Sequence, residues 1–148
     1  MFFAQRSLHD RIDHDRVRKA IADAERQTSG EIRVSIAPFF WGSVEKAAER
    51  AFTRLGMQAT KDRNAILFFF VPGRRRFSVF GDVGIHAKVG PEFWAQVVAA
   101  VAGHFRKGDY TAGLVEGIGI VGRELATYFP FDAAGDVNEL PDDVDPGG

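Results

Sequence analysis

Four oxygen-bearing side chains lie at the ends of the strands that the sequence predicts. Glu31 opens one alternating segment, Asp62 and Asn64 precede a second apolar segment, and Asp82 follows a third. Carboxylate and amide oxygens are the ligands that Ca²⁺ and Mg²⁺ prefer in proteins. If the chain brings these side chains together, they form a candidate site for a divalent cation.

Basic residues close to these oxygens suggest a substrate for the same site. A bound cation could hold a phosphate group, with Arg63 or Lys88, or the neighbouring Lys61, supplying a further positive charge. The pattern also has a purely structural interpretation, because Asp and Asn before a strand commonly bond their own backbone and form turns. No residue stands out as a general base or nucleophile, so the catalytic residues of such a site are unknown.

The strands that position these residues are predicted from hydrophobic spacing. Strict alternation over Glu31–Ile36 predicts a strand with one buried face. The continuous apolar run Ala65–Val71 predicts a central strand covered on both faces. Arg76–Phe80 follows after a short connection and predicts an antiparallel hairpin partner. The connection begins with Pro72-Gly73, which have the residue types of a type II turn.

Four helices are expected around the strands, over residues of about 9–28, 44–55, 91–107 and 110–129. Ser7, Ser43 and Asp109 are the predicted caps of the first, second and fourth helices. The fourth helix contains four glycines, each of which costs an isolated helix about 1 kcal/mol relative to alanine. We therefore expect close packing of that helix against its neighbours, at positions Gly113, Gly117, Gly119 and Gly122.

The resulting order, αβαββαα, predicts an α/β layered domain with a small mixed sheet. A helix joins the first two strands, so they are expected to be parallel, with a right-handed crossover. The third strand runs back along the second. The starts of the first two strands and the end of the third should therefore meet at one edge of the sheet. This edge would bring together Glu31, Asp62, Asn64 and Asp82.

Length and charge divide the chain into two parts. Its 148 residues suit one domain. Residues 132–148 contain six acidic residues and no Lys or Arg, which leaves 19 basic and 14 acidic residues, a net charge of +5, for residues 1–131. We expect residues 1–131 to form the domain and residues 132–148 to form an acidic, disordered tail.

Several classes of protein are excluded or disfavoured. The absence of cysteine excludes disulfides, thiolate metal sites and cysteine nucleophiles. The longest apolar run has seven residues, whereas a membrane helix needs about 20. The N-terminus shows no signal peptide, so a cytoplasmic location is expected, without direct membrane insertion. The glycines of residues 81–90 match neither a P-loop nor a dinucleotide fingerprint, and no organic cofactor is expected.

Two surface features have alternative interpretations. Arg74-Arg75-Arg76 at the hairpin tip could contact nucleic acid, but such a triplet is more typical of a solvated turn, so nucleic-acid binding is not expected. Phe39-Phe40-Trp41 could form an exposed patch that binds a partner. The commoner arrangement for such a cluster folds it back over the core, and this is our prediction.

Four motifs resemble those of a known family. Ser29–Val34 (SGEIRV) is similar to a TGAEIVV opening, and Asp62–Leu67 (DRNAIL) to a DNGVLLL strand. Phe77–Ile85 (FSVFGDVGI) resembles an R-x-x-I-x-x-G-x-G-L/I strand and turn, and Phe105–Leu114 (FRKGDYTAGL) an F-x-x-G-D-Y-x-x-G-L junction. Their order and spacing resemble the TPM domain family, once classed as a domain of unknown function, and in particular its short, soluble branch.

The resemblance implies a three-layer α/β/α sandwich and a choice of functions. The family includes a thylakoid-lumen protein of photosystem II repair, an auxiliary protein of an acetylcholine receptor and many bacterial membrane-anchored proteins. Ca²⁺ binding and acid phosphatase activity have been attributed to some members, which again implies Asp62, Asn64 and Asp82, with Glu31, as cation ligands. We expect a protein-binding or regulatory module whose partner is a membrane-associated protein. The alternative is cation-assisted hydrolysis of a phosphomonoester.

Overall fold

The computed structural model describes residues 12–131 and 144–146, and its sheet has the predicted topology. The strands β1 (Glu31–Ile36), β2 (Ala65–Val71) and β3 (Arg76–Gly81) lie in the order β1-β2-β3. β1 pairs with β2 in parallel, and β2 pairs with β3 antiparallel. The predictions of a mixed sheet with a central second strand are confirmed.

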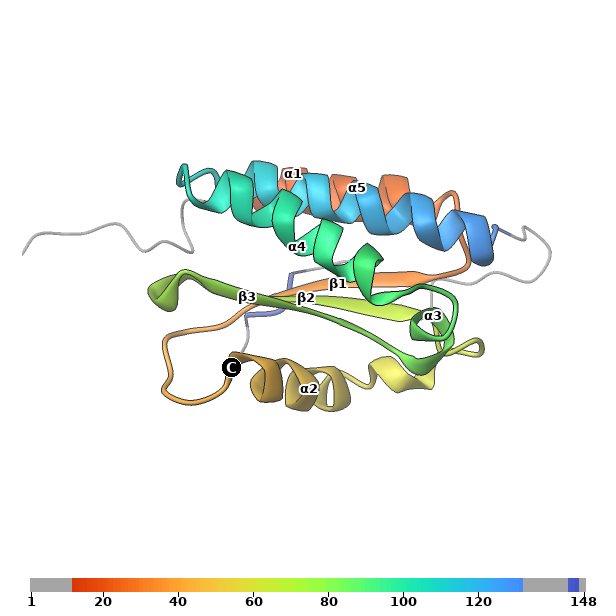
Figure 1. Cartoon of the computed structure of the whole chain (residues 1–148), viewed down its shortest axis with the longest axis horizontal. Coiled ribbons are helices and arrows are strands. Elements are labelled where there is room, and N and C mark those ends of the chain that lie inside the picture. The colour runs from red at the N-terminus through yellow and green to blue at the C-terminus, as the bar shows by residue number, and fades with distance from the viewer. Residues whose placement is uncertain (1–11, 132–143, 147–148) are drawn as a thin grey trace, which may run out of the picture.

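Helices cover both faces of this sheet. Helices α1 (His14–Glu25), α4 (Pro91–Phe105) and α5 (Tyr110–Tyr128) lie on one face, and α2 (Val44–Arg54) lies on the other (Figure 1). The expected three-layer α/β/α sandwich is therefore confirmed. Three short elements were not predicted: the one-turn helix α3 (Val83–His86) and the 3₁₀ turns η2 (Met57–Ala59) and η3 (Pro72–Arg74).

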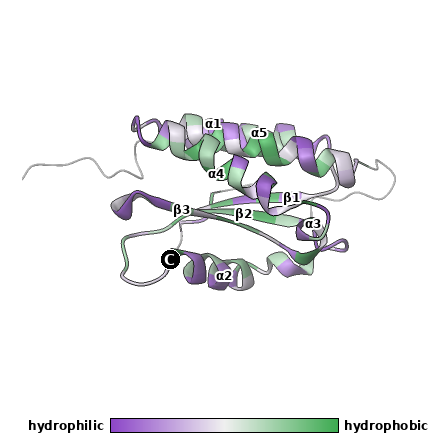
Figure 2. Cartoon of the chain, viewed as in Figure 1, coloured by the Kyte–Doolittle hydropathy of each residue, from purple (hydrophilic) through white to green (hydrophobic). Residues whose placement is uncertain are grey.

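The alternation of side chains along β2 separates two hydrophobic cores. Ile66, Phe68 and Phe70 pack against α1, α4 and α5, whereas Leu67 and Phe69 pack with the apolar face of α2. All seven residues of β2 are buried, as expected for a strand between two layers. Figure 2 shows the hydrophobic residues along β2 and the hydrophilic ones at the hairpin tip between β2 and β3.

The predicted helix caps are partly confirmed. The side chains of Ser43 and Asp109 accept hydrogen bonds from the third residue of α2 and of α5, each at 3.1 Å. Helix α1, however, begins at His14, and Asp13 caps it by accepting from the Arg16 amide at 3.1 Å. The predicted start near residue 9 is wrong, because this aspartate fits the cap geometry. Ser7 lies outside the described residues.

The predicted type II turn at Pro72-Gly73 is wrong. Pro72 instead opens the 3₁₀ turn η3, and the positive φ falls on Arg75, at 51°. The Arg75 amide donates to the Pro72 carbonyl at 3.0 Å and closes the turn. The residue types alone do not distinguish the two turns, because proline suits the first position of both.

The C-terminal region returns to the sheet. Asp145 forms a parallel bridge with Ser35 of β1 and is buried, unlike a residue of a solvated tail. The rest of the expected tail, residues 132–143 and 147–148, lies outside the described residues. Within the part of the chain that the structure describes, no helix combines the length and apolar content that crossing a membrane requires.

The glycines of α5 have different surroundings, which predicts opposite effects of substitution. A Cβ at Gly117 would lie 2.8 Å from Val101 Cγ2 and 2.9 Å from Phe68 Cε1, whereas one at Gly119 would lie 3.5 Å from the flexible end of Arg123. We expect Gly117→Ala to lower the free energy of unfolding by about 1–3 kcal/mol through overpacking. Gly119→Ala should raise it by up to about 1 kcal/mol, because alanine favours the helix. Urea unfolding of both variants measures the difference, and equal shifts would contradict it.

Candidate functional site

The strand register brings three of the predicted residues to one edge of the sheet. Glu31 pairs with Ala65, whose carbonyl accepts a hydrogen bond from the Asp82 amide at 2.9 Å. Asn64 directly precedes Ala65. Glu31, Asn64 and Asp82 are all buried. The expected convergence at the starts of β1 and β2 and the end of β3 is therefore present.

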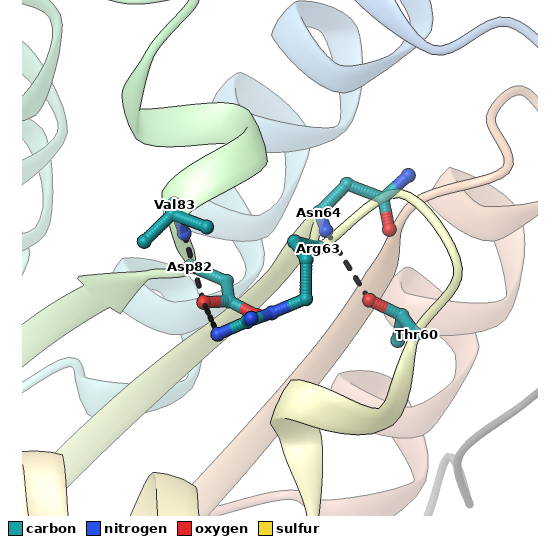
Figure 3. A network of polar contacts seen from close by, with 5 residues as sticks. All are labelled: Thr60, Arg63, Asn64, Asp82 and Val83. Carbon is teal, nitrogen blue, oxygen red and sulfur yellow. Dashed lines mark hydrogen bonds and ion pairs between the residues drawn. The ribbon is translucent and has the colours of Figure 1, made fainter.

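Asp82 is engaged by an arginine from the neighbouring loop. Its Oδ2 accepts from Arg63 Nε at 2.6 Å, and its Oδ1 accepts from Arg63 Nη2 and from the Val83 amide, each at 2.8 Å (Figure 3). The carboxylate is only 3% exposed and is the N-cap of α3. The carboxylate of Asp82 therefore holds the 60–64 loop and α3 together.

Arg63 is held by both its backbone and its side chain. Its φ of 51° is left-handed, a conformation that non-glycine residues rarely adopt. Its amide donates to the Thr60 carbonyl at 3.2 Å, and its carbonyl accepts from the Gly84 amide at 2.8 Å. The hydrogen bond to Asp82 raises the pKa of the guanidinium above its ordinary value. Arg63, predicted to bind a substrate, thus already pairs with a protein carboxylate.

Asn64 makes its hydrogen bonds on the side of the 60–64 loop that lies away from Asp82. Its amide nitrogen in the backbone donates to Thr60 Oγ1 at 3.2 Å, and its Nδ2 donates to Ser29 Oγ at 3.4 Å. Its side chain points away from the Arg63–Asp82 pair (Figure 3). Asn64 Oδ1 is buried and makes no hydrogen bond within the described residues.

The other predicted residues are less closely associated with this edge. Asp62 and Lys88 are exposed. The Asp62 carbonyl lies against Gly84, so close that a side chain at position 84 would overlap it. Lys88 follows the end of α3, where its amide donates to the Ile85 carbonyl at 2.9 Å. The structure thus gathers four of the six predicted residues, Glu31, Arg63, Asn64 and Asp82, at this end of the sheet.

These residues do not form the ligand shell of a cation as they stand. Arg63 and Val83 use both oxygens of Asp82, and the Asn64 amide points elsewhere. Among the described residues, no group of three or more His, Asp or Glu side chains is arranged to hold a metal ion. The cation site remains a prediction, and an ion at Asp82 would share the carboxylate with the guanidinium of Arg63 or displace it.

A second candidate site is the loop of residues 37–43 between β1 and α2, called the aromatic loop below. Phe40 folds back and packs 6.3 Å from Phe69, measured between ring centroids. Phe39 and Trp41 do not: they are 50% and 87% exposed and contact each other edge to face at 4.9 Å. The prediction that all three aromatic residues cover the core is wrong for these two.

The hairpin tip holds the aromatic loop in place. Arg74 Nη1 donates to the carbonyls of Gly42 at 2.6 Å and Phe40 at 3.3 Å, and its guanidinium lies 5.5 Å from the centre of the Phe40 ring. Gly73 leaves room for Phe39, whose ring would lie 3.1 Å from an added Cβ. Arg74 is therefore a support for this loop.

A groove of about 660 Å³ lies between the aromatic loop and α2. Its apolar lining includes Ala37, Ala51 and Phe69, and Phe40 and Trp41 contribute aromatic surface. Arg50 and Arg54 of α2 add positive charge. The groove thus combines an apolar floor, an exposed aromatic side chain and basic groups.

Comparison with known proteins identifies the family. The family model of the TPM domain matches residues 8–124. The chain belongs to the TPM domain family. This TPM domain is similar in structure to the BA42 protein of the psychrophilic bacterium Bizionia argentinensis, with a TM-score of 0.84 and 34% identity over 91% of this chain and 94% of that chain. No curated protein matches the sequence.

A more distant solved structure shares the fold alone. The N-terminal domain of the cg2496 protein from Corynebacterium glutamicum has a TM-score of 0.57 and 14% identity to this TPM domain. The match covers 78% of this chain and 70% of that chain.

Two residues that build the surfaces of this TPM domain could not be identified from the sequence. Arg74 was predicted to be a solvated charge, and Arg54, which pairs with Asp145 at 3.0 Å, was not predicted to have a role. Neither residue belongs to a motif with a recognisable spacing. The exposed Phe39-Phe40-Trp41 cluster was a usable signal, and its alternative interpretation as a binding patch matches the observed exposure of Phe39 and Trp41.

Proposed function

We propose that this TPM domain is a protein-binding module whose partner docks on the aromatic loop and the adjacent groove. The observation that carries the proposal is Trp41, whose side chain is the most exposed large hydrophobic group among the described residues. Tryptophan is enriched among the side chains that dominate binding energy at protein interfaces. The exposed indole of Trp41 and the apolar groove beside it could be buried together by a partner, which would remove their apolar surface from water.

The arrangement of the loop supports this proposal. Arg74 and Gly73 position the loop from the neighbouring hairpin, so Trp41 is displayed from a backbone held at several points. A preformed surface loses less conformational entropy when a partner binds. The loop is therefore organised before binding.

The charge of the groove indicates the chemistry of the partner. Arg50 and Arg54 flank apolar residues, and Arg54 Nη2 already donates a hydrogen bond to a carboxylate oxygen, Asp145 Oδ2, at 3.0 Å. The matching surface is an apolar side chain with acidic residues beside it. In line with the family's varied members, we propose that the partner is a membrane-associated protein.

Trp41→Ala is expected to weaken binding of the partner by tenfold or more, because removing a tryptophan that is a hot spot of an interface costs about 2 kcal/mol or more. The fold should be unchanged, since Trp41 contributes little to the core. Val98→Ala is the matched control: Val98 is 44% exposed on α4, on the other side of the sheet, and should leave binding unaltered.

The experiment has two steps. A photo-crosslinking amino acid at position 39, next to Trp41, captures the partner in cells, and the Val98 position serves as the comparison. The purified partner is then titrated against the wild-type chain and both variants by calorimetry. Equal affinities for wild type and Trp41→Ala, or capture from position 98 as efficient as from position 39, would contradict the proposal.

The alternative function, cation-assisted hydrolysis of a phosphomonoester, depends on the polar residues at the strand ends, Glu31, Asn64 and Asp82. Thermal unfolding with added Ca²⁺ or Mg²⁺ tests whether the ion binds. An ion at a concentration 100 times its dissociation constant would stabilise the fold by about 2.7 kcal/mol. A phosphatase assay on the wild-type chain and on Asp82→Asn, with and without the ion, tests the reaction. Equal activity in the two proteins would remove this alternative.

A further inference from the structure

Residues 144–146 lie along the outer edge of β1, which is an edge strand of the sheet. The Ile36 amide donates to the Asp145 carbonyl at 3.0 Å, and the Asp145 amide donates to the Val34 carbonyl at 3.0 Å. These two bonds form one parallel bridge at the edge of the three-stranded sheet. The edge of β1 therefore already binds an extended segment through its backbone.

The side chain of Asp145 is recognised separately from its backbone. Its Oδ2 accepts from Ser35 Oγ at 3.0 Å and from Arg54 Nη2 at 3.0 Å. Asp145 is buried. One donor comes from β1 and the other from α2. The site therefore binds a carboxylate at one defined position along the bound segment.

The same face of β1 carries a further donor. Arg33 lies two residues before Ser35, and its Nε is buried without a hydrogen-bond partner among the described residues. A parallel strand that places an aspartate opposite Ser35 places its preceding alternate residue opposite Arg33. A ligand with a second acidic residue two positions before its aspartate could therefore pair that residue with Arg33 and the aspartate with Ser35.

The remaining part of this edge is protected by a side chain. Glu25, at the end of α1, accepts a hydrogen bond from the Ile32 amide at 2.7 Å through Oε2. Edge strands with exposed backbone groups tend to pair with other chains, and proteins cover them. Here a carboxylate covers one end of the β1 edge and residues 144–146 cover the other.

We propose that the outer edge of β1 is a binding site for an extended, aspartate-bearing segment of a partner protein, and that residues 144–146 occupy it as an internal ligand. This site is distinct from the aromatic loop. The two surfaces meet at Arg54, which lines the groove and also pairs with Asp145. A partner segment would have to displace the internal one.

The first experiment measures occupancy in the full chain. Asp145→Ala should increase hydrogen exchange at the Ile36 amide by about tenfold or more, because it removes the side-chain anchor that holds the acceptor of that amide. The Phe68 amide in β2 is the internal control and should be unaffected. Unchanged exchange at Ile36 would overturn the internal-ligand part of the proposal.

The second experiment supplies the segment in trans. A dye-labelled peptide with the sequence of residues 140–148 is titrated against the Asp145→Ala protein by fluorescence anisotropy. We expect saturable binding, weakened about tenfold or more when the peptide's aspartate corresponding to position 145 is asparagine, or when the protein also carries Arg54→Ala. Arg123→Ala, which removes an exposed arginine of α5, should leave binding unchanged.

Two results would overturn the proposal of this binding site. The first is failure of the peptide to bind the Asp145→Ala protein. The second is equal binding of the aspartate and asparagine peptides, which would show that the edge pairs with any extended segment. Adding Trp41→Ala to the protein separates this site from the aromatic loop: the peptide should still bind, whatever happens to the partner of that loop.

Discussion

Gly84→Ala is expected to lower the free energy of unfolding by about 3 kcal/mol, the upper part of the range for overpacked sites. A Cβ at position 84 would overlap the carbonyl oxygen of Asp62 and would lie 2.6 Å from that of Arg63. Both atoms belong to the backbone and cannot rotate away. The 60–64 loop would have to move from α3, which would also strain the contact between Arg63 and Asp82.

Chemical denaturation monitored by circular dichroism measures this effect. Gly103→Ala is the matched control, because its Cβ would meet no atom closer than Arg106 Nη2 at 3.9 Å, and alanine should stabilise α4 slightly. If Gly84→Ala were as stable as the wild type, the 60–64 loop would not pack on Gly84, and the described contact between this loop and α3 would be wrong.

Phe70→Ala is expected to lower the free energy of unfolding by about 3–5 kcal/mol, the usual cost of removing a buried aromatic ring. Phe70 is fully buried in β2. Its ring lies 4.5 Å from that of Phe105 and 5.1 Å from that of Tyr110, between centroids. It therefore joins the sheet to the end of α4 and the start of α5, and its loss leaves a cavity between these elements.

Phe131→Ala is the control for this prediction. Phe131 is 48% exposed, and its backbone bond to the Gln27 carbonyl, at 3.3 Å, does not need the side chain. We expect a change of less than about 1 kcal/mol at this position, because surface substitutions have small effects. Similar losses in the two variants, measured by urea unfolding, would contradict the assignment of Phe70 to the core.

The strands could be predicted because their signals are local. The alternation in Glu31–Ile36, the apolar run Ala65–Val71 and the short connection to β3 each specify a strand or a pairing without long-range information. The glycines of α5 could be predicted to allow close packing, but not individually. Gly117 meets Phe68 and Val101, whereas Gly119 faces the end of an arginine side chain, and this difference depends on how the helix is rotated against the sheet.

The turns and helix ends were less predictable, because several residue types suit the same positions. Asp13, and not Ser7, caps α1. Pro72 opens a 3₁₀ turn whose left-handed residue is Arg75, although a glycine is available at position 73. Helix α3 has only four residues, so it leaves no periodic signal, yet it supplies the Val83 amide that binds Asp82.

The sequence by itself determined the family, the order of the elements and the edge at which Glu31, Asn64 and Asp82 meet, because topology follows from local patterns and short connections. Only the tertiary structure decided what these side chains contact: Asp82 turns to Arg63, and Asn64 to Ser29. It also decided the exposure of Trp41 and the return of Asp145 to Ser35, 110 residues earlier. Such contacts depend on side-chain direction and on distant segments, for which no spacing in the chain provides a signal.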